Sequence, residues 1–451
     1  MKEAHLDGSR PESSGKVFRY TVAALVMFLT LFAWGVYFVP MGRYLSVAFP
    51  GDSSVTGFAY GAGPLAAMIS ALIAGWLADK AIPARLLFCL LAVIGGGLLW
   101  LVPMDGVSSV LCGHLGMTKS ASTFSTLLFC HALCYFAALP LLNAIVLQAL
   151  GRDSQFFPWF RSSGTIGWIA SGYAVGLATK VFMLKDAGLD PVIFKIGAVA
   201  FAAAGLIALL LRDKTDSALD AKSDVPPPVV SVRMSDGSVE QRSIPQVFIL
   251  LSDLKFLVFL VFSFLFCIPL ALYFTYANTF IASRGVAHPE AIMTIGQYSE
   301  IVFLLLLPFA FNYLTAKRAL LIGMACWALR YAIFAKSGNT EWMLITGVAL
   351  HGLCYDFFFV TGMQYADRRA PAGLRNLAQS AVSWVTLGLG LWAGNMIAPL
   401  LDSRFIDRSN PAQLVFKDEF WLYPSVFAAV LLVIFAVFYR DETRLTDQPQ
   451  G

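Results

Sequence analysis

The chain has 451 residues, of which 58% are hydrophobic and 13% are charged, and its mean hydropathy is +0.70. Ordinary soluble domains carry about 25% charged residues, so this composition excludes a soluble protein and indicates one that crosses a membrane many times. The net charge of +4 arises in the loops on one side of the predicted membrane. It is therefore a topology signal and gives no indication of nucleic-acid binding.

Twelve apolar runs predict twelve transmembrane helices, because most of them exceed the roughly 20 residues that a helix needs to cross the hydrocarbon. They cover 19–40, 56–78, 86–104, 123–148, 160–181, 193–211, 256–281, 292–314, 317–336, 342–365, 377–400 and 420–439. Alternating segments of about ten residues, the mark of a transmembrane barrel, do not occur, so we expect an all-α polytopic protein. The long first run lacks a small-residue cleavage site behind it, which favours a retained helix over a signal peptide.

The loops predict the orientation and the division of the chain. With both termini on the cytoplasmic side, the inner segments hold 21 of the 32 Lys and Arg residues, as the positive-inside rule requires. A charged segment that contains prolines interrupts the pattern midway. We expect an N-terminal six-helix half over 1–212, a cytoplasmic linker over 213–246 and a C-terminal six-helix half over 247–451. Two such halves are typical of a transporter that holds its substrate near the midplane.

Several other protein classes lack their signatures here. The seven cysteines show no Cys-x-x-Cys motif or paired pattern, and the five histidines form no His-x-x-x-His pair, so we expect no disulfide framework, metal or cofactor. A Walker-type phosphate loop and a Gly-x-Ser-x-Gly elbow are also absent from the sequence. We therefore expect neither an ATP-driven pump nor a hydrolase, and no enzyme activity.

Two carboxylates, Glu300 and Asp356, lie inside long apolar runs. Ionisable groups at membrane depth are costly, so they are candidates for function. Gln297 precedes Glu300 by one helical turn, and Tyr355 precedes Asp356. This pattern predicts a polar pocket within the bundle, although either carboxylate could instead hold two helices together by pairing with an arginine or a helix end. We also expect a structural role, and no substrate contact, for Arg330 in the ninth run, which could pair with a carboxylate or snorkel to the membrane surface.

The segment Gly75-Trp-Leu-Ala-Asp79-Lys80, followed by Arg85, resembles the loop motif between the second and third helices of the major facilitator superfamily. The resemblance implies a cytoplasmic gate in which Asp79 and nearby bases such as Arg85 pair in one state and separate in another. A solvated loop is the alternative interpretation.

Further segments resemble the nucleoside:proton symporter family, the bacterial nucleoside permeases within that superfamily. They are Phe157-Pro-Trp-Phe-Arg161-Ser-Ser-Gly-Thr165-Ile-Gly-Trp168 for the fifth helix, Ile295-Gly-Gln297-Tyr-Ser-Glu300 for the eighth, Ala325-Cys-Trp-Ala-Leu-Arg330 for the ninth, His351-Gly-Leu-Cys-Tyr355-Asp356 for the tenth and Arg375-Asn-Leu-Ala-Gln379 for the eleventh. They occur in the family's order along most of the chain. The resemblance implies the major facilitator fold, proton-coupled nucleoside uptake by alternating access, a bacterial inner membrane and a monomer.

The resemblance also implies a nucleoside site made of Arg161, Thr165, Trp168, Gln297, Glu300, Tyr355 and Asp356. Carboxylates and amides suit ribose hydroxyls, and aromatic rings stack on a base. We assign the sugar to Glu300 and Asp356 and the base to the amide and aromatic side chains. Arg161 could serve the cytoplasmic gate instead. In the seventh helix, Ala271 and Phe274 stand where family members carry amides, which leaves the preferred nucleoside open.

Proton coupling requires a group that changes protonation between the two access states. A carboxylate in apolar surroundings holds its proton more readily, so we predict Asp356 as the carrier, with Glu300 as second choice. Two other functions stay open. A major facilitator symporter for another polar solute such as a sugar would fit the missing seventh-helix amides, and a transporter-like nutrient sensor would bind without turnover and need a partner for the linker.

Overall fold

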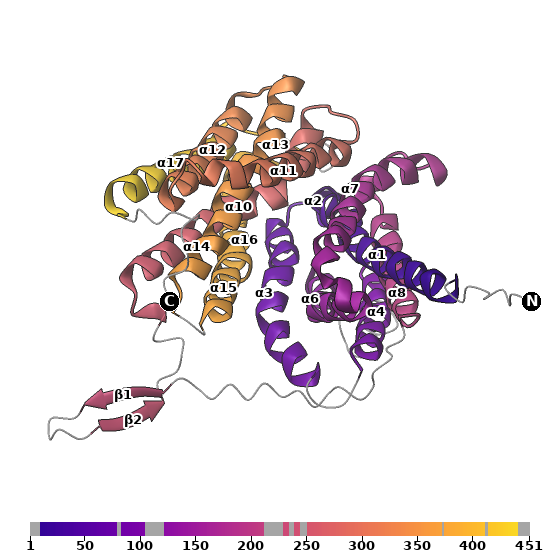
Figure 1. Cartoon of the computed structure of the whole chain (residues 1–451). Helices are drawn as coiled ribbons and strands as arrows, with labels where there is room; N and C mark the ends of the chain where they lie inside the picture. Colours follow the sequence, from indigo (N-terminus) through magenta and orange to yellow (C-terminus); the bar gives the residue numbers. More distant parts are fainter. Residues whose placement is uncertain are drawn as a thin grey trace, which may run out of the picture. The chain divides into compact units, whose positions relative to one another are not determined.

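The computed structural model describes residues 10–78, 83–103, 121–211, 229–233, 239–243, 250–371, 374–410 and 414–440. They are almost entirely helical and divide into two compact units (Figure 1). The first unit comprises Met1–Asp216 with His288–Ala291 and Asn410–Gln413, and the second comprises Ser217–Ala287, Ile292–Ser409 and Leu414–Gly451. The half boundaries and linker drawn from the sequence stay a prediction.

The helices of the first unit are α1 (Arg10–Phe38), α2 (Met41–Ala48), α3 (Ser53–Ala78), α4 (Ala84–Leu101), α6 (Ala121–Leu150), η1 (Gly151–Phe156), α7 (Phe157–Val181), η2 (Ala187–Leu189) and α8 (Val192–Ala208). Those that come after them in the chain are α10 (Leu254–Ser283), α11 (Pro289–Phe311), α12 (Ala316–Lys336), α13 (Glu341–Tyr355), η3 (Asp356–Val360), α14 (Thr361–Arg369), α15 (Arg375–Ser383), η4 (Trp384–Gly390), α16 (Leu391–Phe405) and α17 (Glu419–Phe438).

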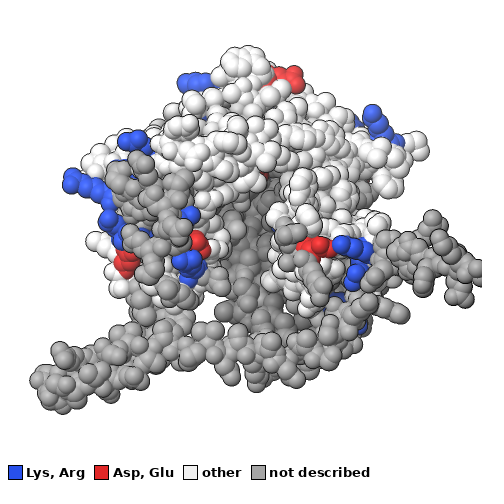
Figure 2. Space-filling model, in the orientation of Figure 1, with Lys and Arg blue, Asp and Glu red and all other residues white. Residues whose placement is uncertain are grey.

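Every apolar run predicted to cross the membrane overlaps helix in the described residues. Nine of these described helical stretches are long and apolar enough to span a bilayer by length and composition, and Val192–Ala208 is a shorter apolar helix. On the face drawn in Figure 2, charged side chains of the described residues stand in small groups separated by broad uncharged surface. This pattern is that of a polytopic membrane protein, as the sequence predicts.

Two antiparallel strand pairs were not predicted. β1 (Val229–Arg233) pairs with β2 (Val239–Ser243), with Val229 opposite Ser243, inside the predicted linker. The shorter β3 (Ile406–Asp407) pairs with β4 (Val415–Phe416). Most of the predicted linker lies outside the described residues.

In the first unit, α1 packs against α7 and α8, and α4 packs against α6 and α8. Small residues allow the closest approach: a Cβ on Gly167 of α7 would lie 2.9 Å from the carbonyl carbon of Phe28 in α1. Trp34 centres an aromatic group there, with its ring 5.5 Å from Tyr135 and 5.2 Å from Trp168. The glycine contact therefore sets the spacing of α1 and α7, and the rings fill the space beside it.

In the second unit, α12 packs against α13 and α17, and α10 packs against α16 and η4. Tyr331 and Trp421 are fully buried and stack with their ring centroids 5.8 Å apart. The Tyr331 hydroxyl donates to the carbonyl of Pro269 in α10 at 2.7 Å. Within a membrane, van der Waals packing and hydrogen bonds of this kind hold helices together. These contacts therefore join α12 to both α10 and α17.

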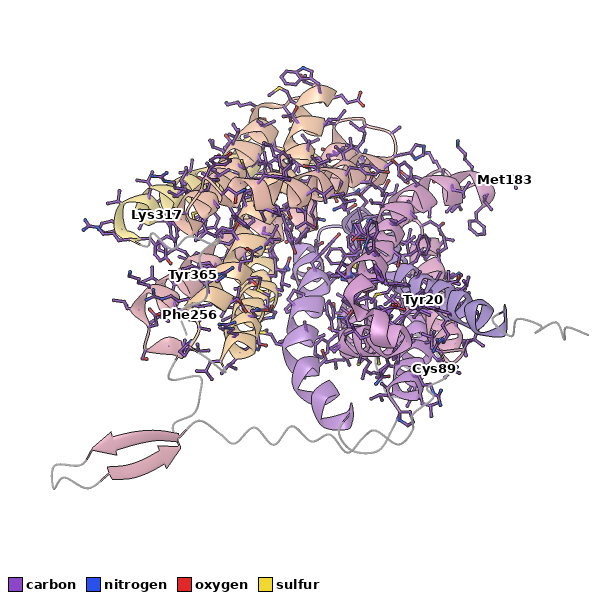
Figure 3. All side chains as sticks on the ribbon, viewed as in Figure 1. Tyr20, Cys89, Met183, Phe256, Lys317 and Tyr365 are labelled. Atoms are coloured by element: carbon purple, nitrogen blue, oxygen red, sulfur yellow. The ribbon has the colours of Figure 1, made fainter. Side chains whose placement is uncertain are left out.

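Helix ends in the second unit are fixed by polar contacts. Asp253 caps α10, since its Oδ1 accepts from the backbone N–H of Lys255 at 3.0 Å and of Phe256 at 3.3 Å. The same carboxylate accepts from both Nε and Nη2 of Arg369, at 2.5 and 3.1 Å, and so ties α10 to the end of α14. Lys317, labelled in Figure 3, lies at the start of α12. Its Nζ donates to the carbonyl of Ala436 at 2.9 Å.

Candidate functional site

Helices α11 and α13 touch through their backbones at the level of the predicted site. A Cβ on Gly352 of α13 would lie 2.5 Å from the amide nitrogen of Glu300 and 2.5 Å from the carbonyl oxygen of Ser299, both in α11. The Ser299 hydroxyl also donates to the carbonyl of Ala349. One turn earlier on α11, a Cβ on Gly296 would meet the His351 side chain at 3.2 Å. Glycine and serine thus permit a contact that brings polar side chains of both helices together.

Asp356 lies one turn beyond that contact, at the start of a π-helical segment. The segment η3 (Asp356–Val360) interrupts the α-helical pattern between α13 and α14. Short π-helical turns inside α-helices frequently mark functional sites, because they change which backbone and side-chain groups face a neighbour. A second such segment, η4, lies in the next transmembrane stretch. The tenth predicted span is therefore one helix with a local change of geometry at its carboxylate.

The Asp356 side chain is 1% exposed, and neither of its carboxylate oxygens has a hydrogen-bond partner among the described residues. Buried polar groups are almost always hydrogen-bonded, and a buried ionised carboxylate without a partner costs several kcal/mol. Glu300, by contrast, is half-buried, on the helix whose backbone meets α13 at Gly352. Of these two carboxylates, Asp356 is the more deeply buried, and in the described part of the chain its oxygens have no hydrogen-bond partner.

The remaining second-unit residues predicted for the site surround this contact. Gln297 and Tyr355 are half-buried, on α11 and at the end of α13. The Tyr355 ring lies 5.4 Å from the His351 ring and 4.8 Å from the Phe359 ring. We call Gln297, Glu300, His351, Tyr355 and Asp356 the α11–α13 cluster. Its polar and aromatic groups match the hydroxyls and flat base of a nucleoside.

The first-unit candidates share one face of α7. Arg161 is exposed, whereas Thr165 and Trp168 are half-buried one and two turns further along. Trp168 packs edge-on against Trp34 and lies 6.1 Å from the ring of Phe38. A ring held on two sides in this way is pre-ordered for stacking on a flat solute. Whether these residues contact the substrate or line a gate stays a prediction.

The gate predicted from the loop motif is only partly visible. Asp79 lies outside the described residues. Arg85, near the start of α4, is half-buried, and its Nη1 donates to the carbonyl of Leu211 at the end of α8 at 3.5 Å. Arg85 thus faces a helix end, and its pairing with Asp79 remains a prediction.

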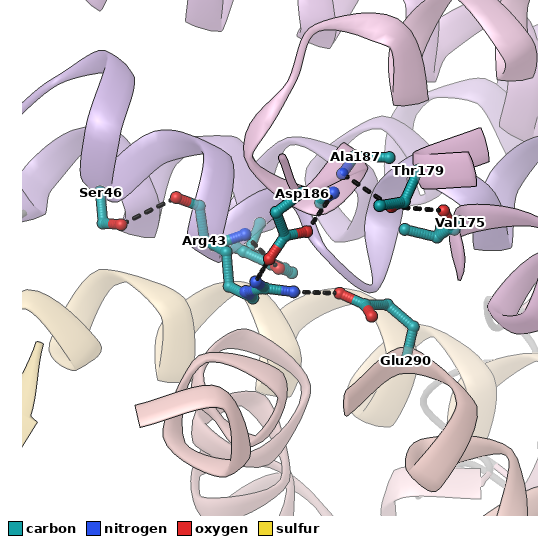
Figure 4. Close-up of polar contacts among 10 residues, drawn as sticks. Arg43, Ser46, Val175, Thr179, Asp186, Ala187 and Glu290 are labelled. Carbon is teal, nitrogen blue, oxygen red and sulfur yellow. Dashed lines mark hydrogen bonds and ion pairs between the residues drawn. The ribbon is translucent and has the colours of Figure 1, made fainter. Parts of the chain in front are cut away.

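A second polar group occupies the opposite end of the first unit, and Figure 4 shows it. Arg43 of α2 is 8% exposed and pairs with Asp186, and its Nη1 also lies 2.6 Å from Oε1 of Glu290. Asp186 accepts from the backbone N–H of Gly188 at 2.9 Å, which fixes the turn before η2. One guanidinium therefore ties α2, the α7–α8 connection and the short stretch His288–Ala291 into this unit.

The sequence did not single out His351, and it offered two structural roles for Arg330, pairing with a carboxylate or snorkelling, that the described residues do not show. His351 is 3% exposed and stands one turn before Tyr355 on the same face of α13, a spacing that could have identified it. Arg330 is fully buried, so it does not snorkel, and among the described residues no carboxylate lies within ion-pair distance of it. Phe274 packs edge-on at 6.1 Å from His351.

Comparisons with known proteins identify a family and related chains. A family model described as nucleoside H+ symporter matches residues 20–444. YegT of Escherichia coli strain K12, a candidate nucleoside transporter, is 29% identical over 424 residues, covering 93% of each chain. The xanthosine permease of the same strain is 22% identical over 429 residues, covering 91% of this chain and 93% of the permease. A crystal structure of the nucleoside transporter NupG has a TM-score of 0.75 at 22% identity, covering 94% of this chain and 99% of that one.

Proposed function

The chain belongs to the nucleoside H+ symporter family, and we propose that Asp356 carries the proton while the α11–α13 cluster binds the nucleoside. The family confirms the sequence prediction of a proton-coupled nucleoside transporter with the major facilitator fold, and such a protein is no enzyme. The proposal assigns the two tasks of this transport, proton carriage and solute binding, to particular side chains.

The observation that carries the proposal is the Asp356 carboxylate, which is buried and has no hydrogen-bond partner among the described residues. In that environment its ionised form is unfavourable, so it takes up a proton when the site is open to the more acidic side. A group with no competing partner is also free to engage a solute. Release of the proton requires exposure to the less acidic side, which alternating access supplies.

Nucleoside binding depends on the same chemistry. Ribose presents hydroxyl groups, from which an ionised Glu300 carboxylate accepts charge-assisted hydrogen bonds, while Asp356 with its proton both donates and accepts as a neutral carboxyl. Glu300 and Asp356 stand on adjacent helices in backbone contact, so one sugar can meet both. The Gln297 amide and the Tyr355 ring suit the edge and the face of a base. The contribution of Arg161, Thr165 and Trp168 is proposed from the family resemblance and from their common face on α7.

The cellular setting is also part of the proposal. The excess of Lys and Arg in alternate loops favours cytoplasmic termini. The resemblance to bacterial nucleoside permeases favours an inner membrane, and the resemblance to the major facilitator superfamily favours a monomer. A lipid bilayer is the medium that the exposed apolar helix faces require. These features can be tested with protease accessibility of the termini in intact and opened cells.

Uptake of radiolabelled uridine and adenosine tests the function and the carrier together. Cells without nucleoside carriers of their own would express wild type, Asp356→Asn and, as a matched control, Glu341→Gln, which neutralises an exposed carboxylate at the start of α13. We expect protonophore-sensitive uptake by wild type and by Glu341→Gln, and loss of concentrative uptake by Asp356→Asn. Uptake of a sugar but of no nucleoside would favour the alternative solute. Unchanged pH dependence in Asp356→Asn would refute Asp356 as carrier.

A further inference from the structure

Among the described residues, Arg330 is a buried cation without an anionic partner. It lies midway along α12 and is 0% exposed. Its guanidinium carbon stands 3.2 Å from the centre of the Tyr273 ring, and Nη1 lies 3.2 Å from Nδ1 of His351 and 3.4 Å from Sγ of Cys354. Within the described part of the chain, its Nε and Nη2 have no hydrogen-bond partner.

This arrangement is poor as a purely structural one. A buried guanidinium is usually matched by a carboxylate, and an apolar residue of similar volume is often at least as stabilising as a buried charge. Here the ring of Tyr273 supplies only a cation–π contact, and two of the three guanidinium nitrogens, Nε and Nη2, are without a partner in the described part of the chain. The directed contacts of the guanidinium are both made by Nη1, with the His351 ring and with the weaker acceptor Sγ of Cys354.

The contact fixes which nitrogen of His351 carries its proton. A guanidinium can only donate, so Nδ1 must be the acceptor and the proton of the neutral ring lies on Nε2. A second proton would remove that acceptor and place an imidazolium 3.2 Å from a cation. Arg330 thus selects one tautomer and opposes the charged form of the ring.

His351 in turn belongs to the α11–α13 cluster. It packs on Gly296, the neighbour of Gln297, and its ring lies 5.4 Å from Tyr355. We propose that Arg330 is a positioning residue that holds His351 as a permanently neutral Nε2–H donor for the nucleoside, a role that rests on the proposed function of the cluster. Proton uptake is then confined to the carboxylates, and the histidine keeps one hydrogen-bonding sense through the cycle.

The groups that face His351 are consistent with a neutral ring beside carboxylates that take up the proton. Tyr273 from α10 stacks on it at 5.4 Å, Phe274 meets it edge-on, and Arg330 approaches from α12. On its own helix, Cys354 donates to the His351 backbone carbonyl at 3.3 Å, and Tyr355 lies beside the ring. Among these neighbours Arg330 bears the only full charge. The backbone of Glu300 in α11 contacts Gly352, the residue that follows His351 in α13.

The tautomer can be read directly in the purified full-length protein. Nitrogen NMR of histidine-labelled protein, with His351→Gln to assign the signal, is expected to show a neutral ring protonated at Nε2 with no titration over the pH range of uptake. A ring protonated at Nδ1, or one that titrates in wild type, would overturn the proposal. This measurement needs no substrate. It therefore tests the tautomer of His351 separately from the proposed nucleoside site, on which the transport role of His351 rests.

Uptake kinetics test the consequence, with Arg318→Met, an exposed arginine on the same helix, as control. Loss of one oriented hydrogen bond predicts that Arg330→Met raises the KM for uridine about tenfold and adds a loss of uptake at acid pH, where His351 becomes protonated. Arg330→Gln keeps a hydrogen-bond donor without the charge, so its KM for uridine is expected to lie close to that of wild type. In a His351→Gln background, Arg330→Met should change KM less than about twofold. Independent, multiplicative effects on KM, or an unaltered pH profile, would refute positioning through His351.

Discussion

Gly352→Ala is expected to separate the two helices that carry the α11–α13 cluster. The added Cβ would stand 2.5 Å from the amide nitrogen of Glu300 and from the carbonyl oxygen of Ser299, whereas ordinary van der Waals contacts begin at 3.4 Å. The obstacle is backbone, which cannot rotate away as a flexible side chain would. The helices must therefore move apart by about 0.9 Å, the difference between these two distances.

The magnitude depends on that displacement. Forcing an extra carbon into a close-packed contact costs about 1–3 kcal/mol, and a misplacement of about 1 Å in a binding constellation can cost about 100-fold in rate. Asp356 comes one turn after Gly352, so its distance to Glu300 changes with the helix spacing. We expect nucleoside uptake by Gly352→Ala to fall by one to two orders of magnitude at similar membrane abundance.

The assay is initial-rate uptake of labelled uridine, normalised to the amount of folded protein in the membrane. Gly97→Ala is the matched control, because a Cβ there meets nothing within 4 Å, and it also lies in a transmembrane helix. This control should transport like wild type, with a slight gain in stability from the better helix propensity of alanine. Wild-type uptake by Gly352→Ala would refute the inference that this contact positions the site.

Further predictions concern charges that hold the second unit together. Arg408→Met leaves the fully buried Asp402 carboxylate with only the Tyr276 hydroxyl, at 2.8 Å, among its described partners. Because one member of a buried ion pair is removed, the protein should lose about 3–5 kcal/mol of stability, and its apparent Tm in detergent should fall well below that of the exposed control Arg404→Met. Equal Tm values for the two variants would contradict this prediction. Partial burial raises the pKa of Asp253, but hydrogen bonds from Arg369 and from the backbone of Phe256 outweigh it and leave the pKa below the ordinary value of 3.8. The stabilisation by Asp253 is thus present above that value and is lost as pH falls through the lower folded-state pKa. Asp253→Asn should therefore lower Tm at neutral pH and flatten its acid dependence, and an unaltered Tm profile would be inconsistent with this role.

The sequence predicts the class, the helices and the order of the site segments, because each depends on local composition or on a contiguous motif. Asp356 stands out because a carboxylate in an apolar run is costly wherever it points. The relation of Arg330 to His351 could not be predicted in this way. The two residues are 21 positions apart on different helices, and a lone arginine in a membrane helix gives no indication of its partner.

Geometry finer than a helix was also beyond the sequence. The π-helical turn at η3 has no motif that distinguishes it from regular helix, and it depends on packing against α12. The sequence shows only that residue 352 is a glycine within an apolar run. Its contact with the α11 backbone shows why a larger side chain is excluded there. The antiparallel pair β1–β2 lies in a segment whose charge and prolines favour a linker.

Proton movement in reconstituted vesicles tests the role of Asp356 most directly. Purified wild type, Asp356→Asn and Glu341→Gln would be placed in liposomes that hold a pH-sensitive dye, and uridine would be added outside. We predict uridine-driven acidification of the interior by wild type and Glu341→Gln, and none by Asp356→Asn, even where that variant still exchanges labelled for unlabelled uridine. Uridine-driven acidification by Asp356→Asn at the wild-type rate would show that the proton travels on another group.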